Sequence, residues 1–242
     1  ETALGLLAVF AGCQNDVVKP LENDKEAPAP VRDVTYTKMS GSVLLTYTLP
    51  SDPDLLYVAA SYTNKAGKKY EFKASYFTNT LLVEGFGDTD TYSLDVYAVD
   101  RSENYSEPVN IQVAADTPPV QAAYETLEVQ PDFGGMTFSF DNASKADLTV
   151  YVSTPNADNE MVNAETFYTG LAKATFSVRG FLDVPRDFEI CFEDKWGNRS
   201  PVKKENLTPI YETELDKKKF KEVILPGDFP CTFYESKMEY TW

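Results

Sequence analysis

The sequence predicts an all-β protein built from two β-sandwiches in tandem. Three observations predict this fold. Short stretches alternate apolar and polar residues at every second position, the two units lack helical periodicity, and the closing pattern of the first unit returns in the second. The length of 242 residues fits two domains of ordinary size.

The first unit is expected over residues 27–116, where seven short stretches have the composition and alternation of strands. These expected strands are residues 31–36, 43–49, 56–62, 70–74, 80–84, 92–99 and 109–113. In the sixth of them, Tyr92, Leu94, Val96 and Ala98 share one face, and the residues between them share the other. This is typical of a half-buried strand.

The second unit is expected over residues 117–208, beginning at a proline break. Its end repeats the end of the first unit, with a strand followed by Asp, a turn with Asn, then Ser and Pro. The matching residues are Asp100, Asn104, Ser106 and Pro108 in the first unit and Asp194, Asn198, Ser200 and Pro201 in the second. Earlier strands are expected at residues 137–140, 148–152 and 174–178, so the chain holds a duplicated module.

The first unit resembles fibronectin type III sandwiches. The opening residues 27–31 and the alternating strand 92–98 carry the resemblance, which implies that Tyr92 is the tyrosine-corner residue. The family's usual tryptophan on the second strand is absent, and Leu45 or Tyr47 stands in its place. The expected fold class is therefore all-β, with two tandem immunoglobulin/fibronectin type III-like β-sandwiches.

The composition excludes several classes of function. A formal net charge of −16 and a pI near 4.4 would repel phosphate backbones, so no nucleic acid partner is expected. The chain has no histidine, which removes the usual general base and the commonest metal ligand. We therefore expect no catalytic residues, no metal and no cofactor.

Two kinds of reactive residue are expected to be structural. The acidic stretches at residues 52–54 and 88–90 lack the rest of a calcium-binding loop, so they are interpreted as turns. Three cysteines, Cys13, Cys191 and Cys231, match neither a zinc site nor a disulfide scaffold. Cys191 lies within a predicted strand and is expected to be a buried, inert thiol.

The first residues have the pattern of an export signal. An apolar, uncharged run over residues 4–12 ends in Ala11-Gly12 directly before Cys13, which resembles a bacterial lipobox. The resemblance implies a signal remnant over residues 1–13 and lipid attachment at Cys13, followed by a flexible tether over residues 14–26. An ordinary secretory signal, or a buried strand with an incidental thiol, is the alternative.

Nearly the whole chain resembles Bacteroides-type outer-membrane lipoproteins from polysaccharide-utilisation loci. The motifs Asp194-x-Trp196-Gly197-Asn198-x-Ser200 and Leu225-Pro226-Gly227-Asp228 carry this resemblance. It implies a surface-exposed protein that captures polysaccharide or oligosaccharide beside a TonB-dependent transporter and its partner lipoprotein. It also implies that residues 209–242, with a short helix over residues 215–220, lead into a discoidin-like domain that this sequence does not contain.

The candidate ligand-binding residues are Trp196, Asn198, Arg199 and Tyr105, because aromatic faces stack on sugar rings and neighbouring polar groups bond their hydroxyls. The alternative for Trp196 is a packing role between the second sandwich and the tail.

Two functions remain open at this point. The first is a non-catalytic surface lipoprotein for glycan capture, in which these domains act mainly as spacer or platform. The second is a protein-interaction or adhesin-stalk module. An exposed aromatic platform would favour sugar, whereas an exposed edge strand with an apolar patch would favour protein.

Overall fold

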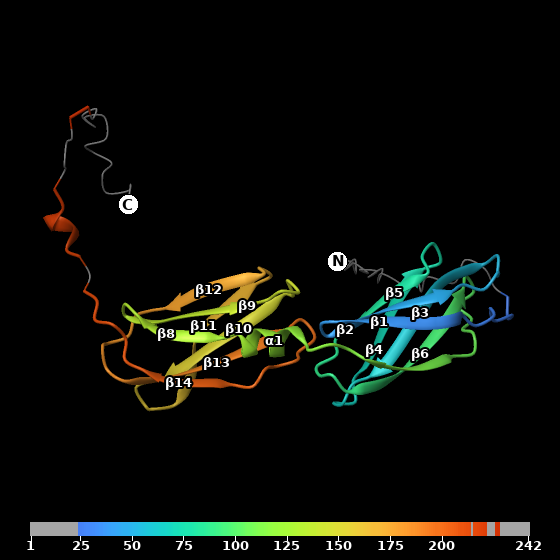
Figure 1. Ribbon diagram of the computed structural model, residues 1–242, viewed down its shortest axis with the longest axis horizontal. Helices are drawn as coiled ribbons and strands as arrows, with labels where there is room; N and C mark the ends of the chain where they lie inside the picture. The colour runs from blue at the N-terminus through green and yellow to red at the C-terminus, as the bar shows by residue number, and fades with distance from the viewer. Residues whose placement is uncertain (1–23, 214, 222–225, 228–242) are drawn as a thin grey trace, which may run out of the picture.

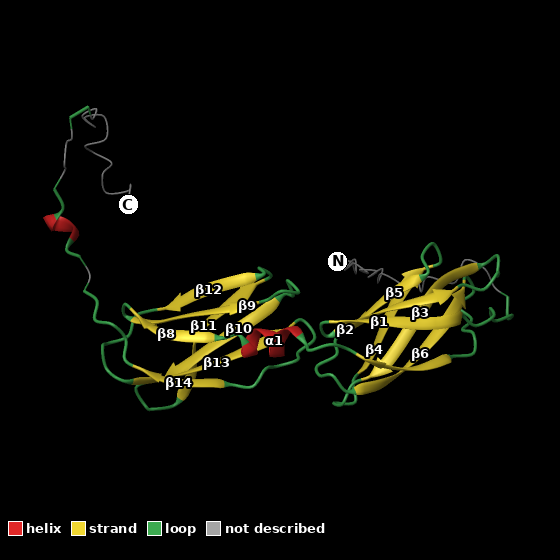
Figure 2. Ribbon diagram, viewed as in Figure 1, coloured by secondary structure: helices red, strands yellow, loops and turns green. Residues whose placement is uncertain are grey.

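The protein is described by a computed structural model that covers residues 24–213, 215–221 and 226–227. Two β-sandwiches lie end to end, and a short helix, α1 (Pro119–Glu125), lies where they meet (Figures 1 and 2). The predicted all-β class with two tandem sandwiches is confirmed. The predicted lipid-attachment residue Cys13 and most of the expected lead-in to a further domain lie outside the described residues.

The first sandwich contains the seven predicted strands. They are β1 (Arg32–Met39), β2 (Ser42–Thr48), β3 (Leu55–Thr63), β4 (Lys69–Ser75), β5 (Thr80–Glu84), β6 (Thr91–Asp100) and β7 (Val109–Ala114). One sheet has the order β1-β2-β5 and the other β4-β3-β6-β7, with antiparallel neighbours throughout. This is the sheet order of a fibronectin type III-like sandwich.

The core follows the predicted alternation. The alternate residues of β6 named above, from Tyr92 to Ala98, are buried and pack against residues of the facing sheet such as Leu45 and Tyr47. The Tyr92 hydroxyl donates to Asp88 Oδ1 at 3.0 Å, four residues upstream. Tyr92 therefore bonds back along the chain as a tyrosine corner does, although its acceptor is a carboxylate side chain instead of a backbone carbonyl.

The second sandwich repeats this plan. Its strands are β8 (Glu128–Asp132), β9 (Gly135–Asp141), β10 (Leu148–Pro155), β11 (Met161–Thr169), β12 (Lys173–Val178), β13 (Arg186–Asp194) and β14 (Lys203–Leu207). The sheets have the orders β8-β9-β12 and β11-β10-β13-β14, which match the first sandwich strand for strand. Helix α1 buries Val120 and Ala123 in this second core.

Three strands and the helix α1 were not named from the sequence. Strand β8 contains Pro131, strand β11 is exposed along most of its length, and strand β14 is short and charged, so none of them shows strong alternation. In the tail, a single 3-10 turn (Lys217–Lys219) stands within the expected short helix.

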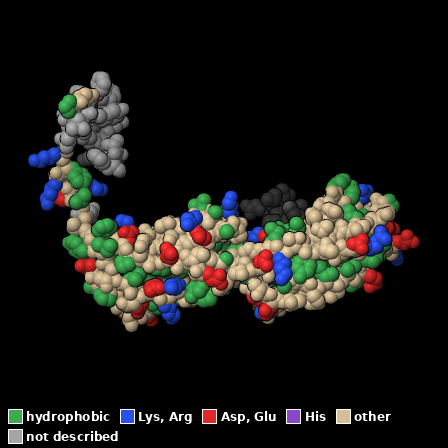
Figure 3. Space-filling view, in the orientation of Figure 1, with side chains coloured by type: hydrophobic (Ala, Val, Ile, Leu, Met, Phe, Trp, Pro, Cys, Tyr) green, Lys and Arg blue, Asp and Glu red, His purple; other side chains and the backbone are tan. Residues whose placement is uncertain are grey.

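The surface is mixed in character. On the face drawn in Figure 3, acidic and basic side chains are interspersed and hydrophobic ones form small groups over both sandwiches. Within the part of the chain that the structure describes, no helix has the length and apolar character needed to cross a bilayer.

Candidate functional site

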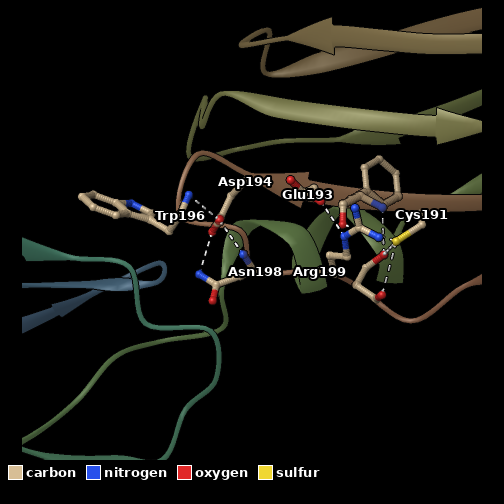
Figure 4. Close-up of polar contacts among 8 residues, drawn as sticks. Cys191, Glu193, Asp194, Trp196, Asn198 and Arg199 are labelled. Carbon is tan, nitrogen blue, oxygen red and sulfur yellow. Dashed lines mark hydrogen bonds and ion pairs between the residues drawn. The ribbon is translucent and has the colours of Figure 1, made fainter. Parts of the chain in front are cut away.

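The motif that closes the second sandwich forms a tight turn after β13. Asp194 Oδ1 accepts hydrogen bonds from the backbone N–H groups of Trp196 at 2.9 Å and Asn198 at 3.0 Å. The Asn198 side-chain amide donates to the other carboxylate oxygen of Asp194 at 2.9 Å (Figure 4). An aspartate and an asparagine at this spacing are therefore needed to hold the turn, which is a structural requirement.

The first sandwich has the same turn after β6. Asp100 Oδ1 accepts from the backbone N–H groups of Ser102 at 2.8 Å and Asn104 at 2.9 Å, and the Asn104 amide donates to Asp100 Oδ2 at 2.9 Å. In both sandwiches the serine of the motif then accepts a backbone N–H of the strand at 3.0 Å, Ala98 in the first and Phe192 in the second. The repeated motif therefore forms the same hydrogen-bonded turn in both sandwiches.

Each turn also holds the part of the chain that precedes its sandwich. Asn198 Nδ2 donates to the carbonyl of Gly85 in the first sandwich at 3.3 Å. Asn104 Nδ2 reaches the carbonyl of Glu26 at 3.3 Å and Asp24 Oδ1 at 3.2 Å. The last residues of the segment predicted as a flexible tether are therefore bonded to the first sandwich.

Trp196 extends from the turn into the first sandwich (Figure 4). Its ring meets Tyr70 and Phe72 edge to face, with both centroid distances 5.5 Å. A Cβ added at Gly85, whose φ is +89°, would lie 3.2 Å from the indole, so glycine allows this close approach. Trp196 is a packing residue, and the first sandwich, instead of the tail, is its partner.

The linker between the sandwiches is bonded along its length. Asp116 exchanges backbone hydrogen bonds with the β1–β2 turn, donating to Met39 O at 3.0 Å and accepting from Gly41 N at 3.1 Å. The Ser40 hydroxyl donates to the Thr117 carbonyl at 2.7 Å. Two prolines follow directly and lead into α1, so the linker lacks the free residues of a flexible hinge.

A cleft of about 690 Å³ lies beside the joint. Its lining includes Met39 and Leu82 from the first sandwich and Asn142, Asp147 and Trp196 from the second. The tryptophan ring in this lining already packs on Tyr70 and Phe72, and the Lys195 ammonium lies 5.1 Å from its centroid. The cleft therefore offers polar groups but little free aromatic face for stacking on a sugar.

Arg199 does not join Trp196 and Asn198. It lies on the other side of the turn, where its guanidinium pairs with Glu193 and sits 5.3 Å from the Tyr151 ring (Figure 4). Cys191 is half-buried nearby and contacts the Ser200 carbonyl at 3.6 Å. The structure thus brings together two of the four candidate ligand-binding residues and separates Arg199 from them.

Tyr105 belongs to a tyrosine cluster on the first sandwich. Its hydroxyl lies 3.3 Å from that of Tyr57, and its ring meets Tyr97 edge to face at 5.6 Å. The Lys73 ammonium donates to the Tyr57 hydroxyl at 3.3 Å. The hydrogen bond with Tyr57, together with burial, raises the pKa of Tyr105 to about 12, so this phenol keeps its proton at neutral pH.

Only Tyr105 of this cluster is among the residues predicted from the sequence, and Tyr57, Tyr97 and Lys73 are not. Alternation placed Tyr97 on the outer face of its strand, but it could not tell which residues of neighbouring strands lie beside it. The signal that would have found the cluster is the pairing register, in which Ala59 stands between Lys73 and Tyr97.

The acidic stretches form turns, as predicted. The Asp52 carbonyl accepts the backbone N–H of Leu55 at 3.4 Å, and the Asp88 side chain accepts that of Asp90 at 3.0 Å. Carboxylate oxygens of Asp24, Asp54 and Asp100 all lie within 4.8 Å of one another. Both Asp100 oxygens accept hydrogen bonds within the closing turn, so this member of the cluster has a structural role.

Comparison with protein families assigns a model to each half of the chain. Residues 28–115 match a domain of unknown function, DUF4959, and residues 116–218 match another, DUF5126. No curated protein sequence matches the chain.

Solved structures similar to this chain include a SusE-like protein, 34% identical over 41% of this chain and 34% of that one, with a TM-score of 0.35. This chain therefore spans about a third of that protein's length. A two-domain fibronectin type III segment of chicken tenascin is 15% identical over 74% of this chain and 99% of that one, with a TM-score of 0.35. The chicken interferon gamma receptor alpha chain is 11% identical over 76% of this chain and 100% of that one, with a TM-score of 0.31. In sheet order, both units are fibronectin type III-like sandwiches, and the family models that match them carry no assigned function.

Proposed function

We propose that this chain is a non-catalytic lipoprotein of the outer membrane surface that takes part in glycan capture for polysaccharide uptake. Its two sandwiches act as a rigid spacer and platform, anchored through Cys13 and working beside a TonB-dependent transporter and its partner lipoprotein. The observation that carries the proposal is the joint, in which Trp196 fixes one sandwich against the next.

The joint supports a spacer because it uses three kinds of contact at once. The linker is hydrogen-bonded to the β1–β2 turn, and the indole packs on two aromatic rings. The Lys195 ammonium also pairs with Glu84 across the joint at 3.2 Å. Relative motion is the default for two domains of one chain. These three contacts act against it and favour a fixed end-to-end arrangement.

The two carboxyls whose pKa clearly shifts, Asp88 and Asp132, do not resemble a catalytic acid. A catalytic acid needs a carboxyl whose pKa is raised, whereas the pKa values of Asp88 and Asp132 are lowered. At Asp88, partial burial acts to raise the pKa, but hydrogen bonds from Lys65, the Asp90 backbone and the Tyr92 hydroxyl outweigh it. These two carboxylates are therefore charged at neutral pH.

Cells that display the full-length protein test the proposal. They are expected to bind fluorescent polysaccharide above the level of cells that lack the protein, and Cys13→Ser is expected to abolish both palmitate labelling and cell-bound signal. Trp196→Ala is expected to lower capture at equal surface amount, with Tyr211→Ala, an exposed tyrosine just after the second sandwich, as the matched control. Equal polysaccharide binding with and without the protein would contradict the proposal.

A protein-interaction role is the second candidate, and strand β11 favours it. This nine-residue strand forms an edge of its sheet, and it exposes Met161, Val162 and Tyr168. An exposed edge with apolar side chains can accept a strand from a partner. If β11 is the docking edge, Val162→Lys is expected to abolish capture of a protein partner from the envelope of the cell that makes this protein. Unchanged capture would exclude that edge.

A further inference from the structure

The outer face of the four-stranded sheet in the first sandwich has an unusual central row. Strand β3 places Tyr57, Ala59, Ser61 and Thr63 on this face, because residues at every second position share a side. Apart from Tyr57, these side chains are small. Thr63 lies six residues after Tyr57, and a strand rises about 3.3 Å per residue. This strip is therefore about 20 Å long.

Longer side chains stand on both sides of the small ones. The register places Lys73 of β4 and Tyr97 of β6 beside Ala59, and Glu71 and Asp95 beside Ser61. Toward the end of β3, Ser61, Thr63, Lys69, Ser93 and Asp95 line a shallow groove of about 360 Å³. The strip is therefore a trough that is open as a groove at its Ser61–Thr63 end, whereas toward Tyr57 the longer neighbours cover Ala59, which is fully buried.

The tyrosine cluster closes the other end of the trough. Tyr97 and Tyr105 are nearly perpendicular, with an angle of 78° between their rings, and Tyr105 is 42% exposed. Tyr105, the exposed member of this pair, therefore offers the aromatic surface available for stacking at this corner. Trp196 lacks such a free face because its ring is packed in the joint.

The charges of the trough are balanced. The Lys73 ammonium lies 3.2 Å from the Glu71 carboxylate, and Asp95 accepts from the Asn110 amide at 2.8 Å. Asn110 also donates to the Ser93 hydroxyl at 2.7 Å. With Lys69 in the groove, the walls hold two cationic side chains, Lys69 and Lys73, and two anionic ones, Glu71 and Asp95. This balance suits a neutral ligand with many hydroxyl groups better than an ionic one.

We propose that this trough binds a linear, neutral oligosaccharide, with a sugar ring stacked at the Tyr97–Tyr105 corner and hydroxyl groups bonded by Lys73, Glu71 and Asp95. The inference rests on the proposed glycan-related function and adds a site within the first sandwich itself. The platform then contributes contacts of its own to glycan capture.

Isothermal titration of the full chain with hexasaccharides of β-glucan, xylan, mannan and α-glucan tests the site. At least one hexasaccharide is expected to bind, and Tyr105→Ala is expected to weaken it by about tenfold or more, as truncation of an aromatic anchor does. Tyr57→Phe, which keeps the ring and removes one hydroxyl, is expected to weaken binding by about three- to tenfold. Tyr211→Ala, an exposed tyrosine beyond the second sandwich, is the matched control and is expected to leave affinity unchanged.

The outcomes separate this site from the proposed function. If the wild type binds a hexasaccharide and Tyr105→Ala binds it equally well, the trough is not the site, whereas glycan capture stands. If the purified chain binds none of the hexasaccharides, the site is overturned, and the cell-surface capture experiment decides the function separately. Loss of a protein partner in Tyr105→Ala, without any glycan binding, would likewise overturn the site. Unchanged calorimetric unfolding of each variant shows that a lost affinity does not come from a lost fold.

Discussion

Trp196→Ala removes the indole that packs between the two sandwiches and leaves the backbone of its turn intact. The indole makes two edge-to-face contacts across the joint, with Tyr70 and Phe72. Each such pair contributes about 0.5–1.5 kcal/mol beyond the burial of its area, so the substitution removes about 1–3 kcal/mol of coupling between the sandwiches. The full cost of truncating a buried Trp does not apply, because this side chain is only half-buried.

Differential scanning calorimetry measures this coupling directly. In the wild type, the sandwich that would melt first is stabilised by its neighbour. The substitution is expected to lower the Tm of the less stable sandwich by about 5–15 °C and to separate the two transitions. Tyr168→Ala, whose side chain is 76% exposed, is expected to change stability by no more than about 0.5 kcal/mol. An unchanged, single transition in Trp196→Ala would refute the claim that Trp196 couples the stability of the two sandwiches.

Three further predictions concern the turns and the first sandwich. Asn198→Ala and Asn104→Ala each remove the amide that closes a turn, and each is expected to lower the free energy of unfolding by about 1–3 kcal/mol. Only Asn198→Ala should also separate the two calorimetric transitions, because only Asn198 bonds across the joint. Gly87→Ala places a Cβ 2.5 Å from Asn198 Oδ1, so it is expected to displace that side chain and lower the same Tm, and an unchanged Tm would argue against the close approach. Asp88 has a pKa below its ordinary value, so its charged form contributes stability that is present above about pH 4 and lost as pH falls through the lowered pKa. The Tm difference between wild type and Asp88→Asn should therefore shrink between about pH 6 and about pH 3, and a pH-independent difference would contradict this reasoning.

The fold was largely predictable because the first sandwich has regular alternation. Strand β6 buries every second residue from Tyr92 to Ala98, and this pattern is visible without any knowledge of its partners. Strand β11 was not predictable in the same way. It lies at a sheet edge with most side chains exposed, so burial did not impose an alternating pattern on its sequence.

The candidate site was only partly predictable. The repeated motif identified the turn at Asp194 and Asn198 because its hydrogen bonds are local in sequence. What Trp196 touches depends on Tyr70 and Phe72, more than a hundred residues away, and local spacing carries no information about such a contact. The same limit applies to the tyrosine cluster, which requires the register of neighbouring strands.

The central claim is that the two sandwiches form one rigid unit. It is tested most directly by the distance between two spin labels, one on a loop of each sandwich. They are placed with Phe77→Cys and Leu182→Cys after replacement of the native cysteines by serine. Both positions are highly exposed, at 82% and 76%, so the labels should not disturb the cores. A single narrow distance distribution that broadens in Trp196→Ala is the predicted result. A broad distribution in the protein with Trp196 intact would show that the joint is a flexible hinge and would contradict the account.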